Sequence, residues 1–203
     1  MKILEMPRSE YPQASLTLTK AFFDYPDLSY YFPDPNKRHA QLKWMLLSGL
    51  VHAGRIGKVL TTEDRLGSMT LLLPGARNLN FWDFLASGHL MAPLKMSRES
   101  LKKMQFCETY TMHIHHELMV GRPHFYIWYL GVDPNAQGKG LGTALILHVQ
   151  TLAKLEHKPI YLETHTIPNV TYYEHLGFRA LAENKIPDHP IRFYNMLWEP
   201  KEA

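Results

Sequence analysis

The chain has 203 residues, of which 45% are apolar and 20% are charged, with a formal net charge of +3. This length and balance suit one sizeable hydrophobic core and are not those of a disordered chain. No apolar run reaches the roughly 20 residues that span a bilayer, and the N-terminus lacks the basic and apolar build of a signal peptide. We therefore expect a single domain, residues 1–203, that is cytoplasmic and has no membrane contact.

Basic residues are scattered along the chain and form no run, so the sequence gives no support to nucleic-acid binding. Cys107 is the single cysteine and has no partner for an internal disulfide, which agrees with a reducing compartment. We expect its side chain to be a small apolar residue buried in the core.

The N-terminal segment predicts a short strand over 2–6, followed by a helix. Ser9 has the side chain of an N-cap, and the helix that it begins is expected to end near Asp24. The next segment, 24–35, contains three prolines and four aromatic residues. We expect this segment to be a loop rich in aromatic surface, because proline interrupts a regular helix.

The middle of the chain predicts a helix, a hairpin and two further helices. Apolar residues recur at helical spacing over 37–52, and two segments with the pattern of strands, 58–62 and 68–73, flank a polar turn that contains glycine. Helices are then expected over 81–90 and over 97–119, the second capped by its first residue, a serine.

The C-terminal half begins with HFYIWYLGV, an aromatic and β-branched run that is typical of a strand buried on both faces of a sheet. The later segments alternate between helix and strand: a helix over 140–156, a strand over 159–164, a helix over 169–176, and strands from 178 and over 191–198. This order predicts a mixed α/β core with a parallel strand pair and helices on both faces.

Glycines come directly after that central strand and lead into a helix. Such a loop exposes unpaired backbone N–H groups and the positive end of the helix dipole, which together favour an anion. Gly138, Gly140 and Gly142 let a phosphate approach the backbone, and Lys139 adds a charge. The alternative is a tight turn with no ligand. The spacing fits neither the dinucleotide fingerprint nor the P-loop.

The pattern Q-x-x-G-x-G over 137–142 resembles the acetyl-CoA loop of the GCN5-related N-acetyltransferase (GNAT) superfamily. About 30 residues later, N…YE-x-x-GF over 169–178 is similar to the second motif of that family. The resemblance implies the acyl-CoA N-acyltransferase fold, in which strands 4 and 5 are parallel and splay apart. It also implies a substrate-side half, 1–122, and an acetyl-CoA-binding half, 123–203.

The resemblance further implies acetyl-CoA as cosubstrate and names the residues that would hold it. The backbone at the end of the fourth strand would meet the pantetheine arm, the loop amides would hold the pyrophosphate, and an asparagine would bind the CoA arm. The matching residues are Leu130, Gly131, Val132, Gln137, Gly138, Lys139, Gly140, Leu141, Gly142, Thr143 and Asn169.

Tyr173 matches the family's tyrosine that protonates the leaving thiolate, a role suited to a phenol that stays protonated at neutral pH. The alternative is that it packs against the sheet, which is the role we expect for Tyr172. The attacking amine must lose a proton, and Glu163 at the end of a strand is the first candidate for the base, ahead of His124 and His165. A buried carboxylate satisfied by backbone donors is the alternative for Glu163.

Two residue groups have more than one interpretation. His113 with His116 or Glu117 lies on one helical face and could hold a metal, but the spacing does not match H-E-x-x-H. We favour solvated or pocket-lining histidines and expect no metal. The aromatic residues either belong to the core or line a substrate pocket: Tyr25, Tyr30, Tyr31, Phe32, Phe81 and Trp82.

These observations predict an N-acetyltransferase that transfers the acetyl group of acetyl-CoA directly to a primary amine of a small molecule. Acetylation of a protein lysine or N-terminus is one alternative, and a catalytically silent CoA-binding sensor is another. The expected partner is the small amine, and a homodimer is left open.

Overall fold

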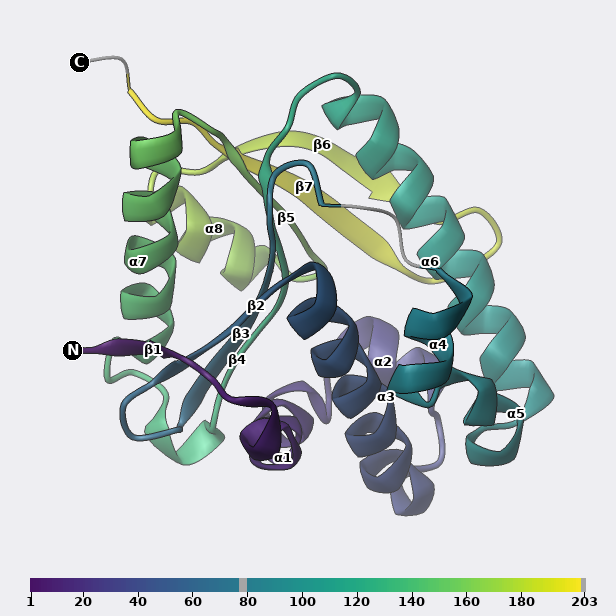
Figure 1. The fold of residues 1–203 in the computed structure, drawn as a ribbon. Coiled ribbons are helices and arrows are strands. Elements are labelled where there is room, and N and C mark those ends of the chain that lie inside the picture. The colour runs from purple at the N-terminus through teal and green to yellow at the C-terminus, as the bar shows by residue number, and fades with distance from the viewer. Residues whose placement is uncertain (77–79, 202–203) are drawn as a thin grey trace.

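The computed structural model describes residues 1–76 and 80–201 (Figure 1). Its strands are β1 (Ile3–Glu5), β2 (Gly57–Thr62), β3 (Gly67–Leu72), β4 (Phe125–Val132), β5 (Ile160–Thr164), β6 (Arg179–Lys185) and β7 (Arg192–Trp198). Its α-helices are α1 (Tyr11–Phe22), α2 (Pro26–Tyr31), α3 (Pro35–Ile56), α4 (Phe81–Ser87), α5 (Ala92–Lys95), α6 (Arg98–Met119), α7 (Leu141–Glu156) and α8 (Ile167–His175).

The strands form one sheet in the order β1-β2-β3-β4-β5-β7-β6, in which β4 pairs antiparallel with β3 and parallel with β5. Adjacent residues of β4 point to opposite faces, and this shows where the helices lie. A side chain at Gly131 would meet α1, whereas Val132 approaches Gly142 at the start of α7. Helices therefore cover both faces, and the predicted mixed α/β class with its parallel pair is confirmed.

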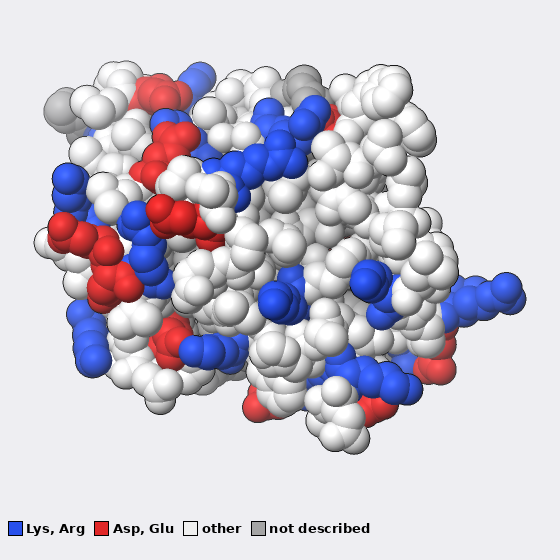
Figure 2. Space-filling view, turned by 60° about the horizontal axis from the view of Figure 1, so that its bottom comes forward, with Lys and Arg blue, Asp and Glu red and all other residues white. Residues whose placement is uncertain are grey.

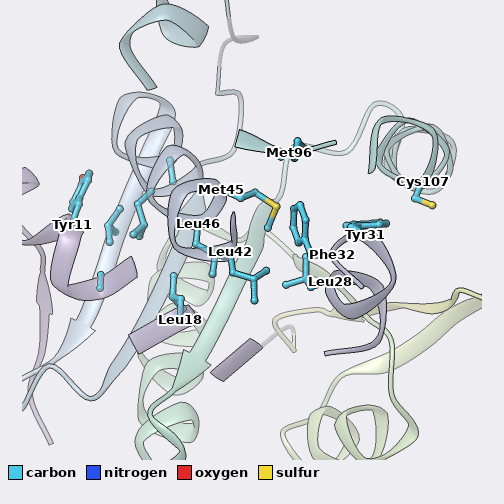
Figure 3. Close-up of a cluster of buried hydrophobic side chains, with 14 of the residues drawn as sticks. Tyr11, Leu18, Leu28, Tyr31, Phe32, Leu42, Met45, Leu46, Met96 and Cys107 are labelled. Carbon is cyan, nitrogen blue, oxygen red and sulfur yellow. The ribbon is translucent and has the colours of Figure 1, made fainter. Parts of the chain in front are cut away.

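The core has a cluster on each side of the sheet. Leu145, Ile146 and Val149 of α7 are fully buried against the strands. On the other side, apolar residues of α1, α2, α3 and α6 meet, and Figure 3 shows Tyr31 between Phe32 and Cys107. Cys107 is completely buried there, so the prediction for this side chain is confirmed.

The predicted loop over 24–35 is wrong, because this segment contains α2 and the start of α3. Pro26 and Pro35 are the first residues of these two helices. Proline is accepted at this position, since the N–H that it lacks would have no partner in the first turn of a helix. Asp34 caps α3 by accepting a hydrogen bond from the Asn36 amide at 3.0 Å. The prolines therefore begin helices here and do not prevent them.

Other helix boundaries in the structure differ from the predicted ones by smaller amounts. Ser9 lies in a 3-10 turn over 8–10 and does not cap α1, which begins at Tyr11. The helix predicted over 81–90 is divided at Gly88, whose φ of 79° ends α4. The hairpin of β2 and β3 is confirmed, as is the serine cap of α6, in which the Ser97 hydroxyl accepts from the Ser100 amide at 3.0 Å.

In the described part of the chain, the helices are too short or too polar to cross a membrane. Figure 2 shows one face of the molecule, on which basic and acidic side chains are intermixed along the left side, while separate basic side chains lie among uncharged ones in the middle.

Candidate active site

The parallel strands β4 and β5 pair over only three residues each. The pairs are Phe125 with Ile160, Tyr126 with Tyr161, and Ile127 with Leu162. β4 continues for five more residues, to Val132, without a further β5 partner. This is the splayed arrangement that the resemblance implied, and it leaves backbone groups of β4 facing an open gap.

The glycine loop lies where β4 ends and α7 begins. Gly138 and Gly140 have φ angles of 76° and 78°, which residues with a side chain rarely adopt, and no atom lies within 4 Å of where a Cβ would be. Gly140 is also the N-cap of α7, so the amides of the first helical turn face the same space. The Lys20 ammonium anchors the loop through Asp133, at 2.8 Å. The loop, called here the cradle, thus has the open backbone geometry of an anion site.

A cavity of about 530 Å³ lies over this cradle. Nine of the residues expected to hold acetyl-CoA line it: Leu130, Val132, Gln137, Gly138, Gly140, Leu141, Gly142, Thr143 and Asn169. Gly131 and Lys139 are not among its lining residues. A side chain at Gly131 would come within 2.8 Å of Leu18 and 3.0 Å of Ala21, so this glycine allows α1 to approach the sheet.

Two adjacent tyrosines of α8 also line this cavity. Tyr173 is buried and packs beside Phe178, and desolvation raises the pKa of its phenol, so the hydroxyl stays protonated. Tyr172 was expected only to pack, but its hydroxyl lies 3.2 Å from the Thr143 hydroxyl across the mouth of the cradle. Sequence reasoning missed this second contact, because it depends on how α8 meets α7.

A second, smaller cavity of about 100 Å³, called here the chamber, lies beside the first. Leu130, Asn169 and Tyr173 line both cavities. A register shift between β3 and β4 places Tyr129 opposite Thr70 and Ile127 opposite Leu71, so that Trp128 is an extra residue. The chamber is lined by Phe22, Tyr25, Asp27, Leu28, Tyr31, Met45, Glu108, Thr111, Tyr126, Ile127, Trp128, Tyr129, Leu130, Leu162, Glu163, His165, Asn169 and Tyr173.

Tyr25 joins three parts of the chamber through its hydroxyl. The hydroxyl lies 2.9 Å from the Thr164 hydroxyl and accepts from the His165 amide at 3.0 Å. Asn169 donates to Thr164 at 3.0 Å and to Tyr25 at 3.4 Å. These contacts fix the end of β5 and the start of α8 against the segment that precedes α2. Asn169 therefore belongs to a network that was not visible in the sequence.

Glu163, the predicted base, lies on β5 in the chamber wall with only 7% of its side chain exposed. Burial raises the pKa of its carboxyl to about 7, while the Tyr126 and Tyr161 phenols beside it favour the ionised form. Its Oε1 atom is buried without a hydrogen-bond partner in the described chain. The alternative of a carboxylate fully satisfied by backbone donors therefore does not describe this atom.

The histidines that the sequence analysis singled out lie in different parts of the structure. His165 lines the chamber, whereas His124 lines a separate outer cavity and lies 2.8 Å from His115, Nε2 to Nε2. His113 pairs with Glu117 at 3.2 Å on an exposed helix face. Within residues 1–76 and 80–201, no three histidine, cysteine, aspartate or glutamate side chains gather as they would around a metal ion.

The aromatic residues considered for the substrate pocket also lie in different places. Tyr25 and Tyr31 line the chamber, whereas Phe32 is a fully buried core residue. Phe81 and Trp82 are 62% and 67% exposed and lie in neither cavity. The proline-rich segment thus supplies part of the chamber wall, including Asp27, which sequence reasoning did not select. Glu108 was missed too.

Comparisons with known proteins agree with this geometry. A model of the acetyltransferase (GNAT) family matches residues 105–178. An uncharacterized N-acetyltransferase of Schizosaccharomyces pombe is 30% identical over 174 residues, which cover 83% of this chain and 70% of that protein. A mycothiol acetyltransferase of Acidothermus cellulolyticus is 43% identical over 56 residues, 26% of this chain and 17% of that protein.

Solved structures share the fold. The polyamine N-acetyltransferase of Drosophila melanogaster has a TM-score of 0.67 at 14% identity, with 98% of this chain and 99% of that chain covered. Arylalkylamine N-acetyltransferase 2 of Aedes aegypti has a TM-score of 0.60 at 17% identity, with the same coverage. The splayed strands, the glycine cradle and the similarity to the fission yeast protein lead to one conclusion: this chain belongs to the acetyltransferase (GNAT) family and is an acetyltransferase.

Proposed function

We propose that this enzyme transfers the acetyl group of acetyl-CoA directly to a primary amine of a small molecule. The observation that carries the proposal is that the cradle cavity and the chamber meet at Leu130, Asn169 and Tyr173. The open cavity has the backbone donors that a pyrophosphate needs. The chamber combines aromatic and aliphatic walls with a few carboxylates, a composition that suits a small organic amine.

In this proposal, acetyl-CoA supplies an acetyl group activated as a thioester. The amides around Gly138 and Gly140 hold its pyrophosphate, because both positions are open and adjoin the start of α7. The pantetheine arm runs along the edge of β4 beyond Ile127, where pairing with β5 has ended. This assigns cofactor binding to residues 123–203, while 1–122 supply much of the chamber. The cytoplasm is the proposed compartment.

In this proposal, two chamber residues accept and donate the protons that move during acetyl transfer. Glu163 takes a proton from the incoming ammonium, which frees the nitrogen lone pair for attack on the acetyl carbon. The new C–N bond forms as the C–S bond breaks, and Tyr173 donates its phenolic proton to the leaving sulfur. The nitrogen loses one more proton as the amide forms, so one proton in total is released for each acetyl group transferred. Placing the two reactants together supplies a large part of the rate.

The test measures thiol release with acetyl-CoA and a panel of small amines. We expect Tyr173→Phe and Glu163→Gln each to lower kcat by about 100-fold, since general acid and base groups contribute factors of this order. Wild-type kcat/KM should rise with pH through about 7, where the Glu163 carboxyl ionises, and Glu163→Gln should lose this rise. Tyr194→Phe removes a phenol outside both cavities and serves as the control.

The outcomes separate this proposal from its alternatives. Thiol release with lysine peptides or protein N-termini but with no small amine would instead indicate a protein acetyltransferase. Binding of acetyl-CoA without thiol release across the whole panel would indicate a CoA-binding sensor. If both site variants turn over amines at the wild-type rate, the assigned acid and base are wrong.

A further inference from the structure

The chamber carries an excess of acidic side chains. Asp27 of α2, Glu108 of α6 and Glu163 of β5 all line it. His165 is the basic side chain among the described residues of its lining, which include no lysine and no arginine. Three carboxylates around a small space with aromatic and aliphatic walls make the chamber suited to positive charge.

Two of these carboxylates each have one oxygen without a hydrogen-bond partner in the described chain, although the Tyr126 and Tyr161 phenols lie beside the Glu163 carboxyl. The Asp27 and Glu163 side chains are 10% and 7% exposed, and Oδ1 of Asp27 and Oε1 of Glu163 are buried without a partner in the described chain. The nearest basic groups, His165 Nε2 to Asp27 Oδ2 and His115 Nδ1 to Glu163 Oε1, are each 3.9 Å away. This exceeds hydrogen-bond distance. Buried polar atoms rarely remain unpaired, so these atoms point to a ligand that donates to them.

Glu108 stands at the border of the chamber. It lines both the chamber and the outer cavity of about 670 Å³, as do Tyr126 and Trp128. Partial desolvation and the nearby charges of Asp27 and Glu163 raise the pKa of its carboxyl, although Glu108 is an exposed residue and water screens these effects. The mutual repulsion of the three groups would be relieved by a cation among them. The shared border also gives an acceptor room to extend outward.

On the basis of the proposed amine acetylation, we propose that the acceptor is an amine with a second cationic group, such as a short diamine. Its reacting nitrogen meets Glu163 near Tyr173, and its distal ammonium lies between Asp27 and Glu108. The methylene chain between the two nitrogens contacts the aromatic walls, which also attract cations. Charge-assisted hydrogen bonds to carboxylates then select for the distal cation.

The first experiment compares kcat/KM for three acceptors of nearly equal length. In 1,4-diaminobutane the distal group is an ammonium, in 1-aminopentane it is a methyl group, and in 4-aminobutanoate it is a carboxylate. We expect the diamine to exceed 1-aminopentane by at least about tenfold, because the distal ammonium gains charge-assisted hydrogen bonds inside the chamber. The aminobutanoate should be the poorest of the three, because its carboxylate is repelled.

The second experiment repeats the comparison with Asp27→Asn and Glu108→Gln, which keep side-chain shape and remove the charge. We expect the ratio of diamine to 1-aminopentane kcat/KM to fall toward one in each variant. Glu99→Gln is the matched control: Glu99 is on α6 as well, but it pairs with Lys103 on the surface, outside the chamber, so the wild-type ratio should persist. Thermal unfolding confirms that each variant is folded.

A ratio near one in the wild-type enzyme would overturn the inference, as would a ratio that neither chamber variant changes. Both results require that some amines are acetylated, so the proposed function would stand. Absence of thiol release with every amine, despite acetyl-CoA binding, would overturn the proposed function and this inference together.

Discussion

The two cavities of this enzyme are built in different ways. Most of the cradle comes from one continuous stretch, 130–143, and its recognition groups are backbone amides at glycines. The chamber collects side chains from α1, α2, α3, α6, β4, β5 and α8, which are up to about 150 residues apart in the chain. The cradle is therefore a local backbone structure, whereas the chamber exists only when distant elements pack together.

Because of this difference, the two cavities are expected to respond differently to amino-acid substitutions. A backbone cradle is insensitive to many side-chain exchanges but is blocked by a charge or bulk placed inside it. A chamber made of side chains is open to change at each wall residue, and its selectivity depends on which groups are left without partners. Variants in the cradle are therefore expected to change cofactor binding, whereas variants in the chamber are expected to change stability and acceptor selectivity.

The largest effect is expected from Thr143→Glu, which places a carboxylate in the cradle. Acetyl-CoA binding measured by titration calorimetry should weaken by at least about 100-fold, because like charges meet at the pyrophosphate position. Folding should be retained, since an acidic residue is favourable in the first turn of a helix. Thr143→Ala should cost less than about tenfold, through its lost contact with Tyr172. Wild-type affinity in Thr143→Glu would show that the cradle does not hold the pyrophosphate.

An intermediate effect is expected in the chamber from Tyr25→Phe. The change removes contacts to Thr164, the His165 amide and Asn169, so the free energy of unfolding should fall by about 2 kcal/mol in urea titrations. Tyr30→Phe is the comparison, because its hydroxyl has one contact, to His189 at 2.6 Å. If the two variants lose equal stability, the Tyr25 network is not what holds the chamber together.

The smallest effect is expected in the pH dependence of folding stability, through the carboxyl of Glu108. Desolvation and two neighbouring carboxylates raise the pKa of Glu108 above its ordinary value of 4.5 in the folded state, but Glu108 is an exposed residue, so solvent screening keeps the effect small. The folded protein then binds the proton more tightly than the unfolded chain. This stability is therefore fully present below pH 4.5 and declines as the pH rises through the raised pKa of the folded state. Glu108→Gln should flatten this decline, so its Tm should exceed that of the wild type at pH 8 but not at pH 4. A parallel shift at both pH values would contradict the assignment.

The sequence predicted the strands and helices well where the pattern was local. The apolar run of β4 and the glycines before α7 each specify their structure through neighbouring residues. The proline-rich segment shows where such reasoning is limited. Pro26 and Pro35 suggested breaks in helical structure, but a proline begins a helix when the residues after it can continue one. Here the α2 residues beyond Pro26 are buried against α3 and α6, and this packing stabilises the short helix.

Of the site, the cradle residues and Tyr173 could be selected from motifs, since a loop at a helix start has its properties wherever it occurs. Glu108 could not be selected, because the pattern of an amphipathic helix does not show which of its exposed glutamates borders a cavity. Its environment comes from Asp27 and Glu163, which belong to other elements. Tyr172 was assigned to packing for the same reason, since its partner Thr143 lies 29 residues away on α7.

The sequence by itself determined the family, the mixed α/β class and the glycine loop at the start of α7, because each depends on the periodicity, glycines and motif spacing of short segments. Only the tertiary structure decided which side chains line the chamber, how the two cavities meet, and that two carboxylates each keep an oxygen without a hydrogen-bond partner in the described chain. The physical reason is that backbone geometry is encoded locally, whereas desolvation and charge at a side chain are set by whatever packs against it.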